Sequence, residues 1–114
     1  MEIQKIDEFD NIISRKECYK LMDIIQKELI TQVRYDIQNK ILKIIKTCCE
    51  EFQYIFDIIL WDKYKIILIT ELLSRFDNLY ICRKLESGIT NILINQNMDI
   101  TNYFNIIGFT IKFY

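Results

Sequence analysis

Residues 36–60, DIQNKILKIIKTCCEEFQYIFDIIL, carry the most regular apolar pattern of the 114-residue chain. Its apolar positions advance by three or four residues at each step, close to the helical period, while most charged side chains fall outside the seam. We expect one helix of about six turns that starts near Asp36. The positions of this seam are Ile37, Ile41, Ile45, Cys48, Phe52, Ile55 and Ile59.

An earlier helix is marked by a capping box, Ser14-Arg15-Lys16-Glu17, in which the Ser hydroxyl and the Glu carboxylate satisfy free backbone N–H groups. This predicts a helix over residues 15–33. Its apolar positions follow the spacing of one buried face, and we expect that face to lie in the core. They are Cys18, Leu21, Met22, Ile25 and Leu29.

A third helix is expected over residues 63–76, with Asp62 as its N-cap. Residues 66–69 are apolar all round, which fits either a buried helix or a central strand. Isoleucine is β-branched and favours strands, but the length of the segment and its continuation to Leu73 favour the helix.

The last third predicts a fourth helix from about residue 77, ended or kinked at Gly88, then a polar loop at residues 95–97. A short helix over residues 99–107 follows. The tail, residues 109–114, alternates with period two and fits a strand without an identifiable partner, or an extended segment across a groove.

These elements predict an all-α fold, a compact bundle of about five helices with a short extended C-terminal segment. At 51% apolar residues, residues 1–114 can bury one core and form a single domain. The chain has 25 isoleucines and no alanine or proline, a bias typical of AT-rich codons. Such a bias favours a small, rapidly evolving genome of a virus or phage.

The sequence contains no recognisable motif for catalysis or for metal or phosphate binding. There is no histidine, the glycines stand alone at 88 and 108, and no phosphate-binding or nucleophile motif occurs. The four cysteines lack metal-ligand spacing, so we expect reduced thiols, no metal and no cofactor. The densest acidic group, Glu50, Glu51 and Asp57, is interpreted as a solvated helix face. We therefore expect a protein that is not an enzyme.

Location is inferred from two absences. The longest uncharged stretches, 87–98 and 100–111, fall short of the roughly 20 apolar residues of a membrane span. The first ten residues, MEIQKIDEFD, lack the basic and apolar regions of a secretion signal. We expect an intracellular protein of the host cytoplasm, with no membrane span.

Aromatic side chains indicate the surface most suited to a partner. Tyr54, Trp61 and Tyr64 flank the junction between the second and third helices, and Trp and Tyr are enriched at the energetic centres of interfaces. We take these three as partner-binding candidates. The aromatic C-terminus offers a second surface, either a core-closing tail or a homodimer contact.

A basic row at Lys40, Lys43 and Lys46 is the candidate for nucleic-acid contact. Glu50 and Glu51 follow one turn later, no aromatic residue is interleaved to stack on bases, and the net charge is −1. A solvated face is favoured over nucleic-acid binding.

The stretches IISRKECYKLMDIIQKEL, LLSRF and GITNILINQNMDITNYFNII resemble, in their apolar layout, the small poxviral Bcl-like proteins. That resemblance implies a helical bundle that binds host proteins. No site residue is transferred, because an Asn-Trp-Gly-Arg type sequence is absent. The function expected is binding and modulation of a host protein through a helical surface. The alternatives are a nucleic-acid-associated or transcription-regulating helical domain and a self-assembling structural subunit.

Overall fold

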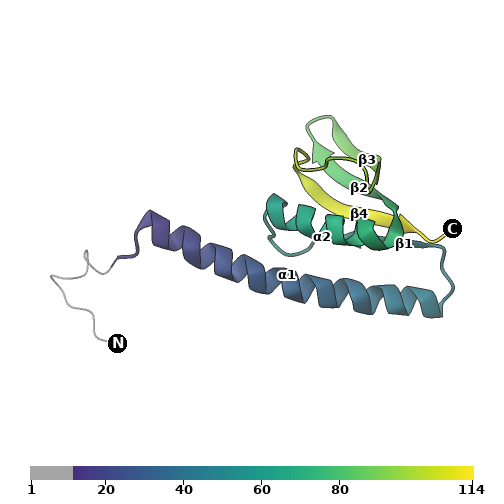
Figure 1. The fold of residues 1–114 in the computed structure, drawn as a ribbon, viewed down its shortest axis with the longest axis horizontal. Coiled ribbons are helices and arrows are strands. Elements are labelled where there is room, and N and C mark those ends of the chain that lie inside the picture. The colour runs from purple at the N-terminus through teal and green to yellow at the C-terminus, as the bar shows by residue number, and fades with distance from the viewer. Residues whose placement is uncertain (1–11) are drawn as a thin grey trace.

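The structure, a computed structural model, describes residues 12–114 and has a mixed α/β fold (Figure 1). Two helices and one four-stranded antiparallel sheet form this part of the chain. The elements in chain order are α1 (Arg15–Lys46), β1 (Glu51–Ile55), α2 (Asp62–Phe76), β2 (Asn78–Leu85), β3 (Gly88–Asn95) and β4 (Ile106–Lys112).

The expectation of an all-α bundle of five helices is therefore wrong. The pattern over residues 36–60 does not form one rod: α1 ends at Lys46, and Cys48 adopts a positive φ of 54° that a continuing helix cannot accommodate. Residues 51–55 then alternate between exposed and buried as β1. Phe52 lies on the buried side of both patterns, so the helical period and the strand period coincide there.

The start of α1 has the Ser14 half of the expected capping box, whereas the Glu17 carboxylate bonds to the Ser14 hydroxyl and not to a backbone N–H. The Glu17 backbone N–H donates to the Ser14 hydroxyl at 3.1 Å, and that hydroxyl donates to the Glu17 carboxylate at 3.0 Å. The helix then runs without a break for 32 residues, so the expected stop at residue 33 is also wrong. The helix expected over residues 63–76 is confirmed as α2, but the expected N-cap is wrong: Asp62 is the first residue of the helix and Trp61 is its N-cap.

The sheet has the order β1-β4-β2-β3, and every neighbouring pair is antiparallel. The C-terminal strand β4 lies between β1 and β2, which are joined along the chain by α2. Phe109 of β4 is opposite Tyr54 on one side and Ile81 on the other. The tail that seemed to lack a partner is thus an interior strand with two.

The segment expected to be a fourth helix is strand β2, and the uncharged segment after it is β3. The two form a hairpin in which Leu85 is paired with Gly88 across a loop of two residues, Glu86 and Ser87. Gly88 has a φ of +122°, which glycine adopts without strain. It closes a hairpin rather than ending a helix. The short helix expected at residues 99–107 is a turn followed by the start of β4.

Both helices lie on the same side of the sheet (Figure 1). α2 contacts β2 and β4, and α1 packs against α2 and β1. The inner face of the sheet and the facing sides of the helices form one core. Its fully buried centre includes Val33, Leu68, Ile69, Leu79, Ile81, Ile94, Ile106, Phe109 and Ile111.

Glycine is required at position 108 because β1 approaches β4 closely there. A Cβ atom at this position would lie 2.3 Å from the Tyr54 carbonyl oxygen and 2.9 Å from Cδ1 of Ile55. The first contact is with backbone, which cannot rotate away. Gly108 therefore allows the edge strand β1 to pair closely with β4.

Gln26 joins α1 to the connection between β1 and α2. It is the one buried polar residue in the described part of the chain, at 6% exposure. Its Nε2 donates to the Ile59 carbonyl at 3.0 Å, and its Oε1 accepts the Trp61 backbone N–H at 2.7 Å. The Gln26 amide thus satisfies two backbone groups that lie between β1 and α2, outside any helix or strand.

Replacing Gln26 by leucine should destabilise the protein. The leucine side chain would keep the volume but leave the Trp61 N–H and the Ile59 carbonyl without this partner, at a cost of about 1–3 kcal/mol in the free energy of unfolding. Urea denaturation followed by circular dichroism measures this. Gln32→Leu, on an exposed side of the same helix, is the matched control and should change stability by less than about 0.5 kcal/mol. Equal effects of the two substitutions would contradict the role given to Gln26.

Neither helix of residues 12–114 has the length and apolar character that crossing a bilayer requires. The stretch MEIQKIDEFD, on which the expectation about secretion was based, lies outside the described residues.

Candidate functional site

The N-terminal part of α1 projects beyond the rest of the molecule (Figure 1, purple). We call residues 15–25 the arm. Among the helix residues, burial begins only at Gln26 and continues through Ile30, Val33, Ile37 and Ile41. The molecule accordingly measures 64 Å along its longest axis and only 33 and 25 Å along the others.

One face of the arm is apolar although it is exposed. Leu21, Met22 and Ile25 have exposed fractions of 48%, 47% and 53%. Cys18 is also exposed, and Leu29 is half-buried. We call these five residues the arm stripe. The sequence predicted this face to lie in the core; the structure contradicts that for the four exposed residues, whereas Leu29 packs against the core.

The arm stripe lies beside the face that α1 presents to the sheet. At about 100° per residue, Met22 is close in angle to Gln26 and Val33, whereas Cys18 and Ile25 are turned away from them by roughly a quarter turn. Residues 18, 22, 25 and 29 follow a 4-3-4 spacing, which is the seam that a helix offers to another helix. Among residues 12–114, no second helix covers this seam.

A polar cluster fixes the point at which the arm leaves the body. The Asp23 carboxylate accepts the Tyr64 hydroxyl at 2.5 Å and lies 3.1 Å from Lys63 Nζ and 3.3 Å from Lys27 Nζ. The Tyr64 hydrogen bond, followed by those of Lys63 and Lys27, lowers the pKa of Asp23 to about 2. Between this cluster and the start of the helix, no side chain of α1 is buried.

Acid should weaken this attachment. The folded pKa of Asp23 is about 2, below the value of 3.8 for a free carboxylate, so its contribution to stability is complete above about pH 4 and is lost as the pH falls towards 2. In Asp23→Asn that contribution is missing, and the free energy of unfolding should fall less between pH 5 and pH 2 than in the wild type.

Urea titrations at half-unit pH steps measure this difference. Glu28→Gln, on the exposed side of the same helix, is the control and should keep the wild-type pH profile. An Asp23→Asn profile parallel to that of the wild type would rule out the carboxylate as the acid-sensitive anchor.

The three aromatic partner-binding candidates are placed differently. Tyr54 is buried at 2% exposure, and its hydroxyl donates to Asp36 at 2.9 Å. Burial, followed by the Asp36 contact, raises the pKa of Tyr54 above its usual range. Tyr64 is also buried, and Trp61 is half-buried with Lys63 Nζ 5.3 Å from its ring centre. Trp61 and Tyr64 lie together at the base of the arm, but Tyr54 lies in the core and offers no surface.

The basic row is on α1, as expected, but it is not a free row of charges. Lys40 Nζ lies 3.1 Å from the Asp36 carboxylate and 5.1 Å from the centre of the Tyr54 ring. Of the three lysines, only Lys43 and Lys46 remain without an ion pair among residues 12–114. They also lie in the last turn of α1, where positive charge stabilises the helix terminus.

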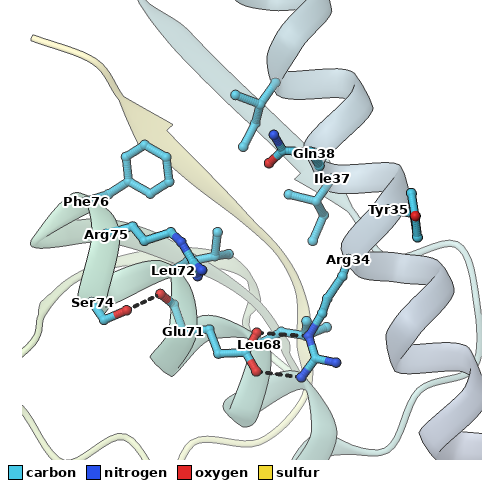
Figure 2. A pocket seen from close by; sticks show the side chains of 11 residues that line it. Arg34, Tyr35, Ile37, Gln38, Leu68, Glu71, Leu72, Ser74, Arg75 and Phe76 are labelled. Atoms are coloured by element: carbon cyan, nitrogen blue, oxygen red, sulfur yellow. Dashed lines mark hydrogen bonds and ion pairs between the residues drawn. The ribbon is translucent and has the colours of Figure 1, made fainter.

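A surface groove runs between α1 and α2 (Figure 2), with a volume of about 710 Å³. Its apolar lining comes from Ile37, Ile41, Leu68, Leu72 and Phe76. At one end Arg34 binds Glu71 through two hydrogen bonds, of 2.9 and 2.5 Å, and this pairing lowers the pKa of Glu71. The groove is on the flank of α1 opposite to the arm stripe, so the two are separate surfaces.

The groove and the rest of the described chain offer little for catalysis. Ser74 in the groove lining donates its hydroxyl proton to the Glu71 carbonyl rather than to a base. Lys65, with a pKa lowered by burial, donates to the Ile106 carbonyl at 2.6 Å and supports the start of β4. No cluster of metal-ligating side chains occurs within residues 12–114. The geometry is suited to binding through surfaces.

The sequence missed Gln26, Arg34 and Glu71. Arg34 and Glu71 are 37 residues apart, and no local pattern indicates that their helices are neighbours. Gln26 did carry a signal, because a polar residue interrupts the apolar seam of a long helix. The C-terminal aromatics are divided between burial and exposure: Phe109 is in the core, Phe113 packs on Phe76, and Tyr114 is exposed.

Comparison with known proteins gives no assignment: no family model, curated protein or solved structure matches this chain significantly.

Proposed function

We propose that this protein binds and modulates a host protein by docking the arm stripe against an apolar helix of that partner. The observation that carries the proposal is the seam of exposed Cys18, Met22 and Ile25, continued by half-buried Leu29 and flanked by exposed Leu21, on a helix that projects from a packed body. A host partner is proposed because the AT-rich codon bias of the composition favours a viral or phage origin.

The partner chemistry follows from the seam. Its four central positions carry no charge and follow the spacing that interlocks with side chains of a second helix. An amphipathic helix laid along the arm would bury the half of each side chain that water now contacts. Trp61, half-buried at the base of the arm, would extend the contact at one end.

The exposed apolar side chains of the arm offer part of the energy of binding. Full burial of a Leu, Ile or Met side chain contributes about 1.5–3 kcal/mol, so completing the burial of a half-exposed side chain contributes roughly 1 kcal/mol. Leu21, Met22 and Ile25 together contribute about 3 kcal/mol before the partner's own residues are counted. The contact needs no chemistry and no cofactor.

Introducing charge into the seam should abolish this binding. In the double variant Met22→Lys, Ile25→Lys, two ammonium groups would have to lose water at the centre of the contact, and we expect affinity to fall at least about 100-fold. Photo-crosslinking in host cells, with a benzoylphenylalanine at position 22, identifies the partner, and calorimetry with the purified partner measures the affinity.

Ile24→Lys is the control, because Ile24 is equally exposed on the same arm but is turned away by about 160° from Met22 and about 100° from Ile25. It should retain the wild-type affinity. Loss of binding in both variants would show that the arm acts only through its overall charge. Retained binding in the double variant would place the contact elsewhere.

A further inference from the structure

The structure has a second unpartnered surface, the free edge of β3, which is independent of the arm. β3 pairs with β2 and forms the outer strand of the sheet. Its eight residues, GITNILIN, contain no charge and no proline. Their register with β2 runs from Gly88 to Asn95 without a bulge.

Exposed strand edges of this kind are usually protected. Charged side chains, proline, bulges or a very short strand keep an edge from pairing with another chain. The opposite edge of this sheet, β1, has such protection, since it is only five residues long and begins with Glu51 after Glu50. β3 has none, and Ile89 and Leu93 next to its edge are 63% and 53% exposed.

The hairpin determines which backbone groups of β3 are free. A two-residue loop joins Leu85 and Gly88 as a hydrogen-bonded pair, and bonded and non-bonded pairs alternate from there along an antiparallel ladder. The hydrogen bond from the Gln96 N–H to the Asp77 carbonyl, at 3.1 Å, continues that alternation beyond the strand. The N–H and C=O groups that point away from β2 therefore belong to Ile89, Asn91, Leu93 and Asn95.

We propose that the β3 edge pairs antiparallel with the β3 edge of a second copy of this chain, giving a two-fold symmetric dimer with a continuous eight-stranded sheet. A two-fold axis at Ile92 places Asn91 opposite Leu93 of the second copy and Ile89 opposite its Asn95. All four outward residues are then paired. Because the strand is uncharged, this register brings no like charges together.

The second copy is favoured over a foreign strand because the β3 edge is complementary to itself. The donors and acceptors left free on one edge match those on its two-fold mate, so one sequence satisfies both sides. The pairing also covers part of the exposed Ile89 and Leu93 side chains. α1, which carries the arm stripe, lies away from β3 (Figure 1). The arm stripe would therefore remain free for a different partner.

Asn91→Pro tests this pairing. Proline removes the outward N–H of residue 91 but none of the bonds to β2, and edge strands tolerate it there. By size-exclusion chromatography with light scattering at about 100 µM, the wild type should be dimeric. Asn91→Pro should be monomeric and retain the wild-type circular dichroism spectrum. Asn91→Ala, which keeps the N–H, is the control and should remain dimeric.

Amide exchange on the wild type gives a second readout that does not depend on the folding of the proline variant. The amides of Ile89, Asn91, Leu93 and Asn95 should exchange more slowly as protein concentration rises, while that of Ile92 should not respond. A monomeric wild type, a dimeric Asn91→Pro variant, or outward amides that exchange independently of concentration would each overturn the proposal. A dimer lost in Met22→Lys, Ile25→Lys instead would assign self-association to the arm.

Discussion

The insertion of β4 between β1 and β2 is the constraint on which the rest of the structure depends. β1 has no other strand to pair with, and β2 would otherwise expose one edge. Phe109 packs among Tyr54, Phe52 and Phe56 at ring-centre distances of 5.5 to 6.1 Å, so the last strand of the chain also completes the aromatic part of the core. Gly108 allows this insertion because any side chain there would collide with the backbone of β1. The fold therefore cannot close until nearly the whole chain is present.

The long helix is held by the closed sheet over part of its length only. Ile30, Val33, Ile37 and Ile41 face the core, Gln26 links α1 to the start of α2, and Asp23 binds Tyr64. N-terminal to these contacts the helix continues with its capping box as a local support. A packed body thus displays a helical arm with an apolar face on one side and an unprotected strand edge on another.

The sequence predicted those features that are decided locally. The capping box at Ser14, the helix over residues 63–76 and the polar loop after residue 95 were found because each depends on neighbours within a few residues. The sheet was missed because the periodicity of a short apolar run fits a buried helix and a buried strand alike, and the choice depends on a partner strand far away. Residues 78–85 and 88–95 become strands through pairing with each other and with β4.

The residues of the candidate site were recognised as an apolar face, but that face was assigned to the core. The apolar seam of Cys18, Met22, Ile25 and Leu29 was recognised, but spacing alone cannot tell whether a seam is covered by the same chain or by another. Tyr54 was chosen for its residue type, whereas its position on the inner face of β1 follows from the pairing with β4. Local patterns thus identified side chains suited to contact, and long-range topology decided which of them reach the surface.

Amide hydrogen exchange of the isolated protein along α1 tests whether the arm is free of the packed body. We expect slow exchange from about Ile30 to Ile41, where the helix covers the core, and exchange faster by orders of magnitude from Cys18 to Met22, where only local helical bonds protect the amides. Uniform slow exchange over both segments in the free monomer would contradict this expectation, because the arm would then be packed against the body rather than presented for a partner.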